Sequence, residues 1–279
     1  MSINFNRNKT QEKYELILGI NTPEELSANK DKFKDYSLND RDVNLLKPLL
    51  KQDALDFFNS AVISFSEGID SIYLRRFSWA TVKLYYSIFY LLRASFACSD
   101  IALLRNRSMY RLKLKAGEKP YTTGNKKYNS THSGTIAHYI DYFSGSDVLL
   151  SNRIDDKDVY QWMEEAREII NYRDVTFRDP ECLEIWTRYR EALDNDDLNV
   201  LLEKIQNDDS YVYCFQEEYA VVAIPIKRMQ QTIKDMSAIG LLSLFQMDRI
   251  EYLETILKSE DRKIHLLENI KNSNIKAIS

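Results

Sequence analysis

Hydrophobic positions recur at helical spacing through most of this 279-residue chain. From Leu55 to Ile69, for example, apolar side chains stand three or four residues apart, which predicts a helix with one buried face. The segment FSWATVKLYYSIFYLLRASFA is apolar on nearly every side, which is typical of a central helix in a bundle. Four segments carry such patterns and are predicted to enclose one core: 53–69, 77–97, 131–143 and 158–172.

Polar stretches and a proline step divide the chain into regions. Residues 1–50 mix short apolar clusters with polar stretches and are interpreted as an N-terminal arm, in which Thr22 caps a short helix that begins at Pro23. The Asp179-Pro180 step disfavours continuation of the fourth helix, because the residue before a proline avoids the α region. The predicted regions are 1–50, 51–180 and 181–279.

The region after Pro180 is predicted to be mostly helical. Apolar spacing indicates these helices: 182–192, 198–205, 226–258 and 253–270. The last of them either packs on the core or docks a partner protein. The segment 211–224, YVYCFQEEYAVVAI, fits either strands or a helix, and its pattern leaves both open.

Composition narrows the fold class. Only 7 Gly and 5 Pro occur, too few for the many turns of an all-β protein, so the fold is predicted to be mainly α. The chain has no apolar run of membrane-spanning length and no signal-peptide pattern, so we expect a cytoplasmic protein without a membrane partner. Three cysteines without paired spacing indicate neither a disulfide framework nor a zinc site, and we expect no metal and no cofactor.

A long basic connection follows the second predicted helix. At about 30 residues it exceeds the 2–8 that usually join helices of a bundle, and such loops tend to be functional or disordered. The chain as a whole carries a net charge of −4, whereas residues 101–132 hold eight cations against the single acid Glu118. The cations are Arg105, Arg107, Arg111, Lys113, Lys115, Lys119, Lys126 and Lys127.

The pattern inside this basic insert, 101–131, predicts a β-hairpin with one basic face. From Tyr110 to Lys115 apolar residues alternate with cations, and a turn follows at 116–118. A row of cations beside Tyr110, Tyr121 and Tyr128 would suit phosphates and stacked bases. A solvated loop, or a face for an acidic partner, accounts for the same charges.

Three motifs in order give the chain a resemblance to a known family. They are Trp79-Ala80-x-x-Lys83-x-Tyr85-Tyr86-Ser87-x-Phe89, then Thr131-His132-Ser133-Gly134, where Ser130 or Thr131 caps a helix, and then Asn171-Tyr172-Arg173-Asp174. In these motifs, residues 51–180 resemble the HEPN family, which is named for nucleotide binding in higher eukaryotes and prokaryotes. The resemblance implies an up-down helical bundle in a subunit of a prokaryotic defence or toxin-type system. It also implies binding and metal-independent cleavage of RNA, pairing as a homodimer, and a protein partner in a multi-subunit system.

The ribonuclease motif of that family is degenerate here. Ribonuclease members carry an arginine, a polar residue and then a histidine, but the run Arg173-Asp174-Val175-Thr176-Phe177-Arg178 ends in arginine. Arginine stays protonated and cannot act as a base. In a second frame Tyr172 follows Arg167, and an ordinary tyrosine with a pKa of about 10 is a poor base at neutral pH. An imidazole would have to come from His132 or His138.

The candidate catalytic residues are therefore Arg173, Asp174, Arg178, Arg167 and Tyr172. The candidate RNA contacts are Arg105, Arg107, Arg111, Lys113, Lys115, Lys126, Lys127 and Asn171. Arginine forks suit phosphate, but Arg173 and Arg178 could equally pair with Asp174, Asp179 or Glu181 and close the end of a helix. The sequence leaves two functions open: an RNA-binding subunit, or a catalytically inactive helical adaptor that docks a partner protein.

Overall fold

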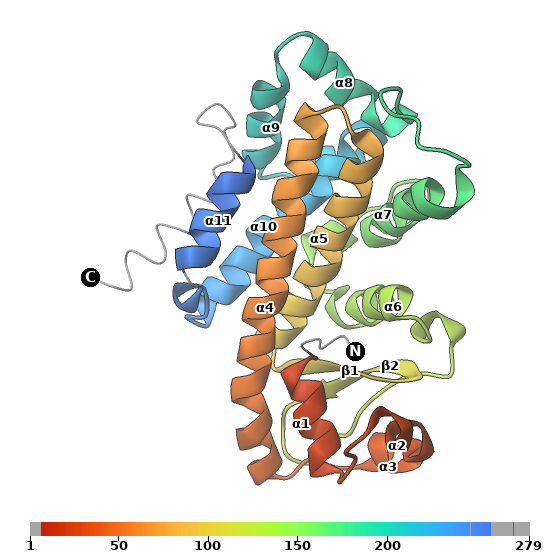
Figure 1. The fold of residues 1–279 in the computed structure, drawn as a ribbon, viewed down its shortest axis with the longest axis vertical. Coiled ribbons are helices and arrows are strands. Elements are labelled where there is room, and N and C mark those ends of the chain that lie inside the picture. The colour runs from red at the N-terminus through yellow and green to blue at the C-terminus, as the bar shows by residue number, and fades with distance from the viewer. Residues whose placement is uncertain (1–6, 246, 258–269, 271–279) are drawn as a thin grey trace, which may run out of the picture. The chain divides into compact units, whose positions relative to one another are not determined.

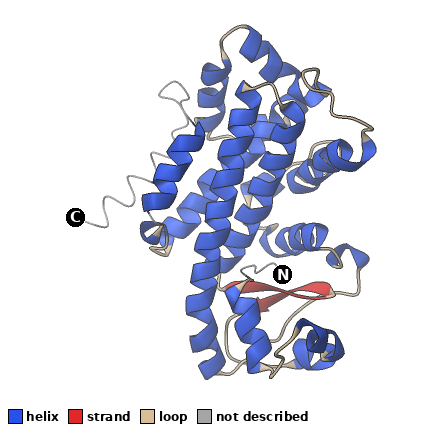
Figure 2. Ribbon diagram, in the orientation of Figure 1, coloured by secondary structure: helices blue, strands red, loops and turns tan. Residues whose placement is uncertain are grey.

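The computed structural model describes residues 7–245, 247–257 and 270. Helices predominate, and the strands of the described part form one two-stranded sheet (Figures 1 and 2), so the mainly α prediction is confirmed. The helices are α1 (Lys9–Ile17), α2 (Pro23–Ala28), α3 (Lys30–Asp35), α4 (Asp40–Tyr73), α5 (Phe77–Cys98), α6 (Thr131–Phe143), α7 (Val159–Glu168), α8 (Thr187–Asp194), α9 (Leu198–Gln206), α10 (Glu217–Ala238) and α11 (Met247–Leu257). The strands are β1 (Ile101–Asn106) and β2 (Ser108–Lys113).

The chain forms two compact units, each built from two stretches of sequence. Unit 1 comprises Met1–Phe57 and Leu92–Asp141, and unit 2 comprises Phe58–Leu91 and Tyr142–Ser279. The four helices predicted to enclose one core are divided between them, with α7 in unit 2 and nearly all of α6 in unit 1. The domain bounds at residues 50 and 180 stay a prediction.

Unit 1 places the hairpin between helices. Tyr110 and Leu112 of β2 are buried, and the Tyr110 ring meets the ring of Phe33 from α3 at 5.4 Å between centroids. On the other face of β2, α6 packs closely, because a Cβ added at Gly134 would lie 2.8 Å from Met109 Cγ and 3.0 Å from the carbonyl oxygen of Tyr128. The glycine of the Thr-His-Ser-Gly motif therefore serves packing.

The predicted N-terminal arm is largely helical in the described part. Thr22 accepts a hydrogen bond from the Glu25 amide at 3.3 Å, which confirms the predicted cap of α2. The carboxylate of Asp53, on α4, accepts hydrogen bonds from the first amides of α1, those of Lys9 at 2.8 Å and Thr10 at 2.9 Å. Those amides have no partner within their own helix, so Asp53 fixes α1 on α4.

The basic insert contains a β-hairpin, but it is not the predicted one, because neither its first strand nor its turn was predicted. The strands β1 and β2 pair antiparallel and turn at Arg107, whose φ is 62°. Residues 116–118 instead belong to a loop that returns to β2, where Arg111 and Tyr121 exchange backbone hydrogen bonds of 2.9 and 2.8 Å. The sequence IALLRN of β1 is buried at five of its six positions. It therefore shows no alternation, and this strand was missed.

Unit 2 is held by a core of aromatic and ionic contacts. Trp186 is fully buried, donates its indole N–H to Thr81 Oγ1 at 2.9 Å, and packs on the rings of Phe77 and Tyr189. The helices α4 and α5 approach closely, since a Cβ at Gly68 would lie 2.9 Å from the Leu84 side chain.

Most helix predictions are confirmed, with differences at the ends. The segments 77–97 and 131–143 correspond to α5 and α6, with Ser130 capping α6 at 2.9 Å, whereas the helix predicted at 53–69 is the middle of the longer α4. The open segment 211–224 is a short 3₁₀ helix, Val212–Phe215, followed by the start of α10. The predicted helix 226–258 is interrupted near Gly240, which has a φ of 68°. Most of the predicted helix 253–270 lies outside the described residues.

Among the described residues, no helix combines the length and the apolar character that a membrane crossing requires.

Candidate functional site

The helix α7 precedes the segment Arg173–Arg178, which we call the arginine motif. This helix has a capped start and ends in an irregular turn. The side chain of Asp158 accepts hydrogen bonds from the amides of Tyr160 at 3.1 Å and Gln161 at 3.0 Å, which caps α7. After Glu168 the chain makes one π-helical turn, Ile169–Arg173, closed by a 2.8 Å hydrogen bond from the Asp174 amide to the Ile169 carbonyl. The motif Asn171-Tyr172-Arg173-Asp174 therefore lies on this single widened turn and its last cap.

Arg167 is part of the core of unit 2. Only 5% of it is exposed, and its guanidinium lies 4.7 Å from the ring centre of Tyr85 and 5.6 Å from that of Tyr172. Burial raises the pKa of the Tyr85 hydroxyl. The Nε atom of Arg167 has no hydrogen-bond partner among the described residues. The two cation–π contacts explain why a buried arginine is stable at this position.

Arg173 and Arg178 are paired with carboxylates. Arg173 lies 3.5 Å from Glu165 and 3.8 Å from Glu168, one or two turns back on α7, while Arg178 lies 3.2 Å from Asp174. Of the predicted partners, Asp174 does pair with Arg178, whereas Arg173 pairs with two carboxylates of α7 that were not predicted. Asn171 and Asp174 are half-buried, whereas Tyr172 is 76% exposed.

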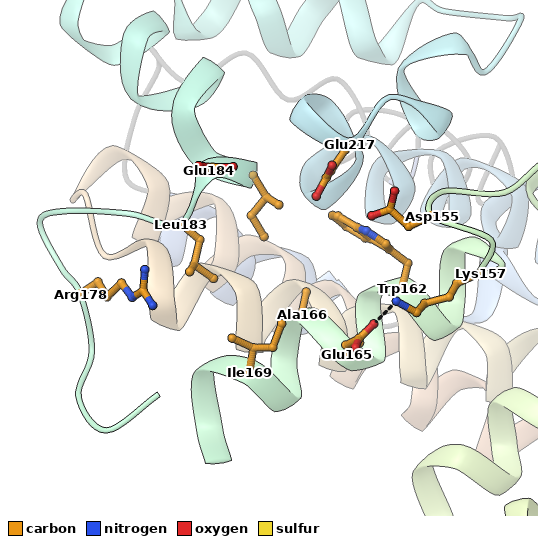
Figure 3. Close-up of a pocket in the computed structure, with 11 residues that line it drawn as sticks. Asp155, Lys157, Trp162, Glu165, Ala166, Ile169, Arg178, Leu183, Glu184 and Glu217 are labelled. Atoms are coloured by element: carbon orange, nitrogen blue, oxygen red, sulfur yellow. Dashed lines mark ion pairs between the residues drawn. The ribbon is translucent and has the colours of Figure 1, made fainter. Parts of the chain in front are cut away.

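A pocket of about 430 Å³ opens beside α7 (Figure 3). It has an apolar lining from Trp162, Ala166, Ile169, Leu183 and Ile185. The charged side chains around it are Asp155, Glu165, Glu184, Glu217, Lys157 and Arg178. Carboxylates outnumber cations by four to two in this lining, so the local charge is negative.

Two carboxyl groups of the pocket have pKa values shifted in opposite directions. The ammonium of Lys157 bonds to Glu165, as Figure 3 shows, and lowers the pKa of that carboxyl group. Burial raises the pKa of Glu217, and the negative charges of Asp155 and Glu184 raise it further. A phosphate entering this pocket would meet the same negative field, so the arrangement disfavours phosphate binding.

Neither histidine of α6 supplies an exposed imidazole. His138 is fully buried in unit 1, donates from Nε2 to the Met109 carbonyl at 3.0 Å, and lies 4.4 Å from the ring of Tyr128. Burial lowers the pKa of His138 to about 4. His132 is half-buried in the first turn of the helix. The idea that His138 serves a catalytic site is therefore wrong.

The basic insert presents most of its cations to solvent. Arg105 and Arg107 are exposed and donate to the hydroxyls of Thr131 and Ser27, and Arg111 pairs with Asp141 at 2.8 Å. Four further lysines are exposed and form no ion pair with any described residue: Lys115, Lys119, Lys126 and Lys127. Lys113 is also exposed.

Two of the three tyrosines predicted to stack bases are core residues. Tyr110 and Tyr128 are each 2% exposed, so the prediction is wrong for both, because Tyr110 packs on Phe33 of α3 and Tyr128 packs on His138 of α6. Tyr121 is 46% exposed.

Charge is segregated between the two units. Unit 1 contains 18 basic and 13 acidic residues, a net charge of +5. Unit 2 contains 20 basic and 29 acidic residues, a net charge of −9. The whole-chain value of −4 therefore conceals a cationic unit.

Comparison with known proteins gives no evidence about the function of this chain. No known family model, curated protein or solved structure matches this chain. The resemblance to HEPN-like bundles stays a prediction. Among the described residues, no group of three or more His, Cys, Asp or Glu side chains is placed to hold a metal ion.

The sequence interpretation missed the acidic side of the arginine cluster. Glu165 and Glu168 lie on α7 and reach Arg173 across the last turns of the helix. Glu165 and Glu168 stand eight and five residues before Arg173, not at the three- or four-residue spacing that places side chains on one face of an α-helix, so helical spacing gave no signal of this pairing. Glu184 and Glu217 come from other elements and carried no such signal.

Replacing both Arg173 and Arg178 by alanine should change the free energy of unfolding by no more than about 1 kcal/mol, because exposed ion pairs contribute little. Urea unfolding of the double variant and the wild type measures this difference. A loss of several kcal/mol would show that the arginines hold the π-helical turn in place.

Proposed function

We propose that this chain binds RNA through a cationic surface of unit 1, which we call the hairpin surface. It consists of Arg105, Arg107, Lys113, Lys115, Lys119, Lys126 and Lys127. The observation that carries the proposal is the set of exposed lysines that form no ion pair with a described residue, in a unit of net charge +5. Cations already paired with carboxylates would gain less from meeting a phosphate, whereas these lysines are available for phosphates.

In this proposal Arg167, Arg173 and Arg178 contribute to the structure of unit 2 and do not contact RNA. Arg167 is held between aromatic rings, and Arg173 and Arg178 are paired beside a pocket of negative charge. We therefore propose RNA binding without RNA cleavage by the Arg173–Arg178 motif. We propose that the chain acts as a HEPN-like subunit of a prokaryotic defence or toxin-type system, which is the setting that the resemblance implies.

The test measures RNA affinity against salt. Fluorescence anisotropy with a labelled single-stranded RNA, from about 50 to 200 mM salt, gives the slope of log affinity against log salt. Replacing Lys115, Lys119, Lys126 and Lys127 by glutamine should weaken binding at every salt concentration. It should reduce the slope by about 3 if all four contact phosphates, since each contact to a single strand contributes about 0.7.

The double variant of Arg173 and Arg178 is the matched control. It also removes exposed cations, but from unit 2, and it should keep the affinity and the slope of the wild type. A loss in the double variant of about half the loss in the lysine variant would contradict the proposal, because it would mean that the RNA responds only to the number of cations removed, two against four.

A second function, docking of a partner protein, is favoured by one observation. The exposed apolar side chains of unit 2 include Trp79, Tyr172, Val175 and Phe177. The rings of Trp79 and Phe177 meet edge to face at 5.3 Å. Exposed apolar patches mark interaction surfaces, and the resemblance implies two partners, a second copy of this chain and another protein of a multi-subunit system. If the wild type binds no RNA at low salt, this adaptor function takes the place of the first.

A further inference from the structure

Tyr121 differs from the other tyrosines of the basic insert. It is 46% exposed, whereas Tyr110 and Tyr128 are buried. Its backbone is fixed to the middle of β2 by two hydrogen bonds with Arg111, of 2.9 and 2.8 Å. The Tyr121 ring is therefore exposed on backbone that is paired with β2, although the residue follows a loop.

The neighbouring arginine supports the ring from one side. The Arg111 guanidinium lies 4.5 Å from the ring centre of Tyr121, and Asp141 of α6 holds that guanidinium at 2.8 Å. A cation over an aromatic face is stabilising and restricts the ring. Nearly half of the residue stays accessible, which leaves room for a second flat group.

Exposed cations surround this ring along the chain. Lys119 stands two residues before Tyr121, and Lys113 stands two residues after its bridge partner Arg111. Lys126 follows beyond Gly124 and forms no ion pair with a described residue. An aromatic platform flanked by cations is the arrangement that binds the bases and phosphates of single strands.

We propose that Tyr121 stacks on an unpaired base, so that the nucleic acid recognised by the hairpin surface is single-stranded. This inference rests on the proposed function and names its ligand class. In a duplex the faces of each base are covered by neighbouring bases, so only a single strand offers a face to Tyr121. Stacking has little dependence on which base is present, so binding is broad in sequence.

The experiment compares wild type, Tyr121→Leu and Tyr121→Phe on three probes. The probes are an oligoadenylate of about 12 nucleotides, a duplex of the same length, and a strand of abasic sugar phosphates. Tyr121→Leu should bind oligoadenylate about tenfold more weakly and should bind the abasic strand as the wild type does. Tyr121→Phe, which keeps the aromatic face, should retain wild-type affinity. Thermal unfolding checks that both variants are folded.

The outcomes separate this inference from the proposed function. If the lysine variant loses affinity but Tyr121→Leu binds oligoadenylate as the wild type does, stacking is overturned and the hairpin surface stands. Equal affinity of the wild type for duplex and single strand would also overturn the inference. Absence of binding to every probe at about 50 mM salt would overturn both.

Discussion

Replacing Asp147 by alanine should destabilise unit 2 by about 3 kcal/mol, because the substitution leaves a buried charge with too few partners. Arg228 of α10 is 2% exposed, and its guanidinium lies 3.1 Å from the equally enclosed carboxylate of Asp147. Asp147 also accepts hydrogen bonds from the Tyr160 hydroxyl and the Leu149 amide. One truncation therefore removes an ion pair and leaves two further donors unsatisfied.

The expected loss lies at the lower end of the usual range of about 3–5 kcal/mol for breaking a buried pair, because Arg228 keeps a second partner. Asp235 lies 3.1 Å from Arg228, but its side chain is 45% exposed. Asp235→Ala is thus a matched control on the same arginine, with an expected loss below about 1 kcal/mol.

Urea unfolding, followed by circular dichroism, measures both variants. Equal losses for Asp147→Ala and Asp235→Ala would show that the Arg228 charge is compensated by solvent and not by the buried carboxylate.

The Arg228–Asp147 pair also shows why part of this fold could not be predicted from the sequence. Its partners are 81 positions apart, and the cation lies within the apolar run of α10. Helical spacing reports what lies on one face of one element, so it located α5 and α6 well. It does not report which distant element supplies a counter-charge, and no local pattern distinguishes a buried arginine from one that reaches solvent.

The candidate sites divide in the same way. The pairing of Arg178 with Asp174 is local, and it was one of the two interpretations available beforehand. The burial of Tyr128 was not, because it depends on the packing of α6 against the hairpin. The alternation of Tyr110 with Arg111 did indicate opposite faces, but treating both as ligand contacts overlooked that consequence.

The stability of unit 1 should fall as the pH is lowered from about 6.5 to about 4, by about 3 kcal/mol in total from His138 alone. Burial lowers the pKa of His138 in the folded protein to about 4, whereas an unfolded histidine has a pKa of about 6.5. The unfolded chain therefore takes up the proton first. The stabilisation is complete above pH 6.5 and is lost as the pH falls toward 4.

A comparison of wild type with His138→Gln isolates this effect. Glutamine does not titrate and can still donate to the Met109 carbonyl, which His138 Nε2 reaches at 3.0 Å. Carboxyl groups titrate in both proteins, so the difference between their unfolding free energies reports the histidine. That difference should shrink by about 1.4 kcal/mol per pH unit in the middle of the interval. If His138→Gln keeps the pH dependence of the wild type, the imidazole is protonated in place and its surroundings admit a charge.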